Sequence, residues 1–286
     1  MGGATARAID TTPVERAAAA VIEAAEARAW ADLYAAAPPR WAAQVDLGWR
    51  QIGGALVLQW GATGRRYFSR AIGLGVTEPA SEATIDAVLG LWREHGIEMF
   101  LLQSLPHCAP GGYEGWLTER GLAPFDAQDR IVRGAEPIVA APGSGEREIV
   151  VERVASEGAG EWSRFLQDAY GLDTGPWLPR LVGRRGWRQY VAREGGEIVG
   201  ARGMFIGEDG LAWLGMEGPV PGITTEDYEV DAALCARIVA DGLSAGARGF
   251  IADIEAPSQR MDTPAYGDFA RLGFRRPYLR THWTVT

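Results

Sequence analysis

The spacing of apolar residues predicts a chain that alternates between helices and short strands. Residues 14–37 carry apolar side chains three and four positions apart, which predicts an amphipathic helix that Pro38 and Pro39 end. Ser81 is a suitable N-cap for a second helix over 81–96, and a glycine ends it. Apolar runs between and after these helices predict strands at 54–60, 67–76, 98–106 and 129–134.

The second half of the chain repeats this plan. After a strand at 147–154 and two helical stretches, residues 187–220 predict three antiparallel strands with glycine-containing turns. An amphipathic helix follows at 229–247, and a strand, a short helix and a last strand follow it. The stretches 112–125 and 265–278 share a short helix, a Gly cap and an apolar strand, which indicates two copies of one α/β unit.

These patterns predict the fold class and the domains. We expect an α/β (α+β) chain with mixed, mostly antiparallel sheets flanked by helices. The stretch 135–146, AEPIVAAPGSGE, has the composition of a linker. It separates a diverged N-terminal unit, residues 1–134, from a C-terminal unit, residues 147–286.

Composition narrows the range of functions. The 286 residues are 47% hydrophobic, enough for a sizeable core, and no apolar run approaches the ~20 residues that span a bilayer. The net charge of −9 argues against nonspecific binding of nucleic acid. Two cysteines without metal spacing and the lack of a secretory pattern favour a reducing cytoplasm. We therefore expect a cytoplasmic monomer or homodimer with a small-molecule substrate, no nucleic-acid or membrane partner and no metal.

The second half resembles the GCN5-related N-acetyltransferase (GNAT) superfamily, on residues 190–220, the helix from about 229, residues 248–256 and 266–283, and the order of their elements. The whole chain resembles bacterial tandem-domain members, in which 70–80 and 100–107 mark the diverged N-terminal copy. This resemblance implies an N-acyltransferase that acts on a small-molecule amine, with acetyl-CoA or another acyl-CoA as the donor. The family's strand before the central helix supplies backbone groups to the pantetheine arm, which implies Met216, Gly218 and Val220 as cofactor-binding residues.

The segment after that strand departs from the family pattern. The family places glycines and an Arg or Gln where a helix N-terminus meets the CoA pyrophosphate. Here residues 221–231, PGITTEDYEVD, contain four carboxylates, no Arg, and no Gly after Gly222. The acids complement the helix dipole, with Thr224 or Thr225 as the N-cap, so we expect atypical and weak CoA binding. A shifted CoA position or a bridging divalent cation is an alternative.

Two further functions stay open on this departure. One is a GNAT-fold enzyme that no longer uses CoA and catalyses a decarboxylation, an elimination or a cyclisation in a biosynthetic pathway. The other is a non-catalytic GNAT-like binding protein.

Acidic side chains on two neighbouring strands are the catalytic candidates. Glu217 ends the strand before the central helix, and Asp253 and Glu255 share one face of the strand after it. A partly desolvated carboxylate there has a raised pKa that suits a general base. Phe269 occupies the position of the family's acidic Tyr, so Tyr266, about one turn earlier, is the candidate proton donor.

Three residues are candidates for substrate binding. Trp213, on the strand leading to Glu217, can form a pocket wall, and Gln103 and His107 in the first half can line a pocket or an interface. Structural roles compete with all of these assignments. Tyr266 and Trp213 suit the core, and the acids can pair with Arg side chains, of which the candidates are Arg275, Arg276 and Arg280.

Overall fold

The computed structural model divides the chain into two compact units, which are described separately. The N-terminal unit comprises 13–129, 255–257 and 278–286, and the C-terminal unit comprises 1–12, 130–254 and 258–277. Residues 139–146 of the expected linker, Val220 and the Thr224 cap lie outside the described residues. The structure describes residues 9–61, 63–138, 147–219, 225–255 and 264–285.

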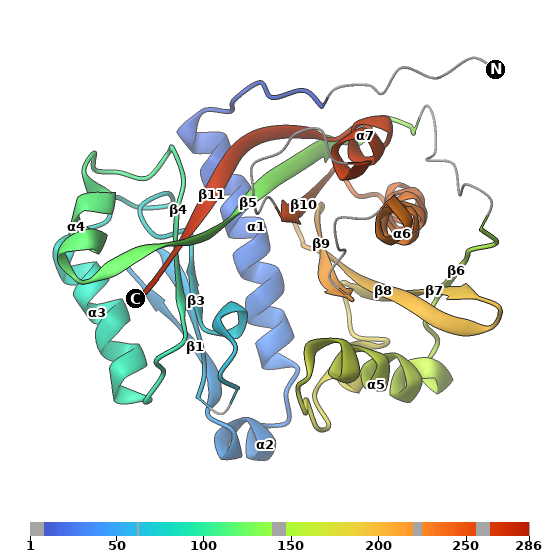
Figure 1. The fold of residues 1–286 in the computed structure, drawn as a ribbon, viewed down its shortest axis with the longest axis horizontal. Coiled ribbons are helices and arrows are strands. Elements are labelled where there is room, and N and C mark those ends of the chain that lie inside the picture. Colours follow the sequence, from blue (N-terminus) through green and yellow to red (C-terminus); the bar gives the residue numbers. More distant parts are fainter. Residues whose placement is uncertain (1–8, 62, 139–146, 220–224, 256–263, 286) are drawn as a thin grey trace. The chain divides into compact units, whose positions relative to one another are not determined.

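The N-terminal unit is a mixed sheet covered by helices (Figure 1). Its share of the sheet has the order β1-β2-β3-β4-β11-β5, in which β3 and β4 are parallel, while β1 with β2, β2 with β3, and β4 with β11 are antiparallel. The strands β5 and β11 divide their residues between the two units. The bounds are α1 (Arg16–Ala35), α2 (Pro39–Gln44), β1 (Leu47–Ile52), β2 (Ala55–Trp60), β3 (Arg70–Ile72), α3 (Glu82–Glu94), β4 (Leu101–Ser104), α4 (Tyr113–Glu119), β5 (Leu122–Gly134) and β11 (Arg275–Val285).

Local chemistry sets several of these boundaries. Ser81 caps α3 in a reciprocal capping box with Thr84, as the sequence predicted. The strand expected at 67–76 shrinks to β3, because Gly73 and Gly75 take φ values of 82° and 78°, which an extended strand does not have. The short helix α2 begins at Pro39, where a missing N–H costs nothing.

The buried side of α1 differs from the apolar stripe that its period predicts. Val21 is 53% exposed, whereas Glu23 and Glu26 are fully buried. Glu26 pairs with Arg70 at 2.9 Å and with Arg280 at 2.5 Å. Arg280 also lies 3.4 Å from Glu23, which accepts a hydrogen bond from the Tyr278 hydroxyl at 2.8 Å. The unit therefore contains an internal network of charges that links α1 to β3 and β11.

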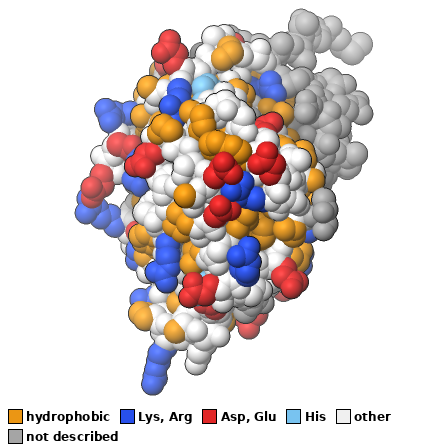
Figure 2. All heavy atoms as spheres, turned by 90° about the vertical axis from the view of Figure 1, so that its left-hand side faces the viewer, with side chains coloured by type: hydrophobic (Ala, Val, Ile, Leu, Met, Phe, Trp, Pro, Cys, Tyr) orange, Lys and Arg blue, Asp and Glu red, His pale blue; other side chains and the backbone are white. Residues whose placement is uncertain are grey.

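Charges of both signs are interspersed over the side of the molecule on which Figure 1 shows α3 and α4 (Figure 2). On the described part of this face, no extended patch of one sign is visible (Figure 2). Arg120 of this unit, for example, pairs with Glu82 and Asp86 of α3. None of the described helices combines the length and the low polarity that crossing a bilayer requires.

The C-terminal unit is a sheet with helices on both faces. Its strand order is β5-β10-β9-β8-β7-β6. The pairs β6–β7, β7–β8 and β8–β9 are antiparallel, and β10 is parallel to β9. A Cβ on Gly218 of β9 would meet α5, and a Cβ on Gly200 of β8 would meet α6, so these helices cover opposite faces (Figure 1). The bounds are β6 (Val150–Arg153), α5 (Ala159–Tyr170), β7 (Trp187–Glu194), β8 (Glu197–Ile206), β9 (Leu211–Gly218), α6 (Thr225–Ser244), β10 (Gly249–Glu255) and α7 (Pro264–Arg271).

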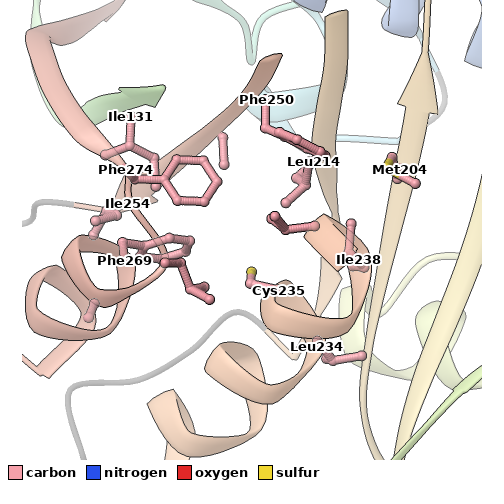
Figure 3. Close-up of a cluster of buried hydrophobic side chains, with 14 of the residues drawn as sticks. Ile131, Met204, Leu214, Leu234, Cys235, Ile238, Phe250, Ile254, Phe269 and Phe274 are labelled. Carbon is pink, nitrogen blue, oxygen red and sulfur yellow. The ribbon is translucent and has the colours of Figure 1, made fainter. Parts of the chain in front are cut away.

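An apolar core joins α6 and α7 to the sheet of this unit. Leu234 and Ile238 of α6 and Phe269 of α7 belong to one cluster with strand side chains such as Leu214 and Phe250 (Figure 3). Of the two helical stretches predicted between residues 154 and 187, the second, at 175–186, is only a 3₁₀ turn over Leu178–Leu181. Gly175 precedes this turn, and Gly183 and Gly186 follow it, all with positive φ. Because an α-helix requires negative φ, the helix cannot extend through these positions.

Candidate functional site

The strand β9 leaves its neighbour β10 halfway along its length. The two strands pair at Leu211–Trp213 and Gly249–Ile251, and no pairing continues beyond this in the described residues. On its other edge, β9 stays paired with β8 up to Gly218. The backbone edge of β9 after Trp213 therefore has no strand beside it on the β10 side.

A bulge re-aims the end of β9 at the same place. The register with β8 shifts between Ala201 and Gly203, so that Met216 and Glu217 together stand opposite Arg202. Met216 has φ 56°, which a bulky side chain rarely adopts. As a result, a Cβ on Gly218 would point towards α5, whereas the side chain of the neighbouring Glu217 points to the α6 side.

A buried charge network lies beneath the bulge on the α6 side. Arg202 of β8 donates to Asp231 of α6, and their side chains are only 2% and 9% exposed. Burial raises the pKa of the Glu217 carboxyl; Arg202 opposes this rise, and the charges of Asp231 and Asp253 add to it. The Cys235 thiol lies beside Asp231, and burial raises its pKa well above the usual value. Glu217 is therefore a carboxyl that burial makes harder to ionise than an exposed glutamate.

A pocket of about 470 Å³ opens over this network. Its walls come from β8, the end of β9 and the first half of α6, and Arg147 and Glu194, which pair at 2.8 Å, stand at its side. Three carboxylates and one guanidinium line it, so it suits a cationic or neutral ligand better than an anion. The lining residues are Arg147, Glu194, Val199, Gly200, Ala201, Glu217, Gly218, Pro219, Val230, Asp231 and Leu234.

Tyr170, at the C-terminal end of α5, holds the opposite side of the bulge. Its hydroxyl donates to the Glu217 carbonyl oxygen at 2.8 Å, and a Cβ on Gly218 would lie 2.6 Å from Leu166 of α5. The end of β9 is thus fixed between α5 and α6. Sequence reasoning missed Tyr170 and Arg202; the available signal for Arg202 was a lone cation within an apolar strand.

The other acidic candidates occupy different surroundings. Asp253 lies on β10 and pairs with Arg130 at 3.3 Å, a partner that the sequence did not suggest. The backbone of Glu255 ends β10, but its side chain lies outside the described residues. Of the suggested Arg partners, Arg280 binds carboxylates of the N-terminal unit and Arg275 donates to the Thr12 carbonyl.

The aromatic candidates are core residues of the same unit. Tyr266 is 3% exposed and belongs to the cluster that contains Phe269 and Phe274. Trp213 is 3% exposed, and its ring lies edge-on to that of Trp187, with centroids 6.3 Å apart. Burial agrees with their structural roles, and neither residue lines the pocket described above.

Gln103 and His107 belong to the N-terminal unit. The Gln103 amide nitrogen lies 3.2 Å from Nε2 of His282, whose Nδ1 lies 2.6 Å from Asp126. Burial lowers the pKa of His282, against the opposing effect of Asp126. His107 Nε2 lies 2.6 Å from the Val14 carbonyl oxygen, a contact in which the ring nitrogen donates. Substrate binding by Gln103 and His107 stays a prediction.

No group of three or more His, Cys, Asp or Glu residues among those described is arranged to hold a metal ion. No family model and no curated protein matches the chain.

Solved structures do match the chain over most of its length. A GCN5-related N-acetyltransferase from Kribbella flavida is similar to 83% of this chain and 88% of its own, with 18% identity and a TM-score of 0.52. Another, from Sphaerobacter thermophilus, covers 80% of both chains with 14% identity and a TM-score of 0.53. The fold is that of the GCN5-related N-acetyltransferases. A functionally unknown conserved protein from Staphylococcus epidermidis is similar to 84% of this chain and 94% of its own, with 12% identity and a TM-score of 0.52.

The expected GNAT fold and the mixed α/β class are thus confirmed. At identities of 12–18%, the likeness extends to the fold alone.

Proposed function

We propose that this GNAT-fold chain is an N-acyltransferase that moves an acyl group from an acyl-CoA to a small-molecule amine. The observation that carries the proposal is the end of β9, where an unpaired strand edge, a bulge and a carboxyl of raised pKa adjoin one pocket. The acyl-CoA supplies a thioester, whose carbonyl carbon is open to attack by an amine.

The pocket suits the amine. Most small amines are ammonium ions near neutral pH. Glu194 and Asp231 are paired with Arg147 and Arg202, so among the carboxylates that line the pocket it is Glu217, once ionised, whose charge attracts a cation. The ammonium ion must lose a proton before nitrogen can attack, and Glu217 is the carboxyl whose pKa burial raises towards the working range of a general base. Nitrogen then bonds to the carbonyl carbon, the C–S bond breaks, and the sulfur leaves as a thiolate that takes up a proton.

The free edge of β9 suits an extended amide-bearing arm. Met216 and Gly218 stand where the strand has left β10, so we assign their backbone groups to the pantetheine arm, with Val220 next along the chain. The CoA diphosphate fits less well, because the segment 221–231 where it would bind contains four carboxylates. Two like charges about 4 Å apart repel each other by on the order of 1 kcal/mol at a water-like dielectric and 4 kcal/mol at a surface dielectric. We therefore expect acyl-CoA to bind weakly and in an atypical position.

Calorimetric titration with acetyl-CoA and a thermal shift measurement test this proposal. A true site filled at a hundredfold excess over its dissociation constant adds about 2.7 kcal/mol of stability. Glu217→Gln should then remove acyl transfer to a panel of primary amines while leaving acetyl-CoA affinity within about twofold, because the carboxyl acts on the amine. Glu197→Gln, at an exposed position on β8, is the matched control and should keep full activity.

The carboxylates in the pocket also favour the second candidate, a GNAT-fold enzyme that works without CoA on a cationic small molecule. Absence of any stabilisation by acetyl-CoA at millimolar concentration, together with loss of small-amine binding in Glu217→Gln, would select this candidate over the first.

A further inference from the structure

On the α5 face of β7–β9, opposite the Glu217 carboxyl, the buried polar side chain of Gln189 lies in aromatic surroundings. Gly218 points towards α5, and residues paired across strands share a face, so the alternation along β7–β9 identifies the rest of this surface. One row across the three strands is Gln189, Gly203 and Gly215, and the next row is Trp187, Phe205 and Trp213.

Gln189 is 1% exposed, and neither its amide oxygen nor its amide nitrogen has a hydrogen-bond partner among the described residues. Buried amides almost always find partners, because an unpaired one loses its hydration and receives nothing in return. A buried amide with both ends unpaired therefore takes its partners from outside the described side chains, from a water molecule or from a ligand.

Two glycines give this amide its position. A Cβ on Gly203 would lie 2.7 Å from Gln189 Oε1 and 3.6 Å from the Cβ of Met216. A Cβ on Gly215 would overlap the Trp213 ring. The Gln189 side chain thus crosses β8 over a bare backbone position and ends beside the β9 bulge, next to Trp213.

If the proposed function holds, the amine and the acyl group lie on opposite faces of β9. The amine occupies the pocket on the α6 side, with Glu217 and Asp231. The carbonyl carbon then lies at the bulge, and the rest of the acyl group extends to the α5 side, towards Gln189 and Trp213. Neither row on that side contains a charged residue.

We infer that Gln189 recognises the acyl group, and that this group is a short acyl chain with a neutral hydrogen-bonding substituent, a hydroxyl or an amide. A hydroxyl both donates and accepts, so a single one satisfies both ends of the Gln189 amide. A carboxylate only accepts, and it would be buried without a cation. This inference rests on the proposed function and names its donor substrate.

The experiment compares 3-hydroxybutyryl-CoA with butyryl-CoA, which differ by one hydroxyl, in calorimetric titrations of the full chain. The wild type should bind the hydroxylated thioester about tenfold more tightly, the typical effect of one good hydrogen bond. In Gln189→Leu this preference should vanish or reverse.

Melting temperatures supply a second readout that needs no ligand. Gln189→Leu should leave the melting temperature unchanged or raise it, because an unpaired amide is replaced by an apolar group of similar size. Gln128→Leu is the matched control: Gln128 accepts from Arg280 at 3.1 Å, so its loss should lower the melting temperature.

Four results would overturn the inference. Equal binding of the two thioesters by the wild type, or an unchanged preference in Gln189→Leu, removes Gln189 from acyl recognition and leaves the proposed function intact. A fall in melting temperature for Gln189→Leu as large as that for Gln128→Leu makes the amide structural. If neither thioester binds, the proposed acyltransferase function fails and this inference fails with it.

Discussion

Replacing Asp231 by Asn tests the charge network beneath the bulge most directly. The change leaves the Arg202 guanidinium, 2% exposed, without its carboxylate partner. Breaking a buried ion pair in this way typically costs about 3–5 kcal/mol. Because the Glu217 charge also attracts Arg202, it offsets part of the loss, and we expect about 2–3 kcal/mol. For a unit of this size, that corresponds to a fall of about 4–12 °C in melting temperature.

Scanning calorimetry of the two single variants and the double variant measures the coupling. Arg202→Met alone leaves Asp231 and Glu217 as neighbouring carboxylates without their cation, which is also unfavourable. Arg202→Met with Asp231→Asn removes both charges, so its loss should be smaller than the sum of the two single losses by about 2 kcal/mol. If the losses add within about 0.5 kcal/mol, the pair is not coupled and the network has been misread.

Asp231→Asn should also change the pH dependence of activity. Asp231 is one of the charges that raise the pKa of Glu217, so Asp231→Asn should lower that pKa. The acid limb of the pH profile of acyl transfer should then move to lower pH, because Glu217 ionises earlier. Glu197→Gln removes an exposed charge and should leave the profile in place; an equal shift in both variants would point to net charge as the cause.

Three further outcomes are expected. Folding raises the pKa of Glu217 above 4.5, so wild-type stability falls as the pH rises from about 4.5 through the folded-state pKa. Glu217→Gln lacks this loss, so its melting temperature minus that of the wild type should increase over this pH window. A decrease would contradict the assignment. Tyr170→Phe leaves the Glu217 carbonyl without this donor and should cost about 1–2 kcal/mol in chemical denaturation, whereas no change would show that the hydroxyl does not hold the bulge. Burial raises the pKa of Cys108 to about 12 and that of Cys235 well above its usual value, so neither thiol should react rapidly with a disulfide reagent at pH 8 until the chain unfolds; fast reaction in the folded state would place a thiol in a more polar environment.

The elements that the sequence predicted well are those whose apolar period is local and strong. The helix α3, its Ser81 cap and the three strands β7–β9 lie close to their predicted places. The strand β1 was missed, because Gly48, Arg50 and Gln51 interrupt its apolar pattern and half of its residues are exposed. Edge strands with solvated faces give weak periodic signals.

The charged parts of the site were harder to predict for a different reason. Glu217 was found because it ends a strand before a helix, a position that local pattern defines. Its neighbour Arg202 was missed, because the partner that makes Arg202 tolerable in the core, Asp231, lies 29 positions away. In α1, Glu23 and Glu26 read as a polar face, and only residues far along the chain make their burial possible.

That network in the N-terminal unit has a consequence for the order in which the chain is made. Arg280 and Tyr278 reach Glu23 and Glu26 across separations of 254 to 257 positions. A ribosome therefore finishes the bulk of this unit, residues 13–129, long before it makes the cation and the hydroxyl that balance the two buried glutamates. Until β11 arrives, closing the unit would bury both carboxylates without Arg280 and Tyr278, although Arg70 can already pair with Glu26. We expect the unit to stay protease-sensitive on stalled ribosomes that have not released residue 280, and to gain protection once β11 has emerged.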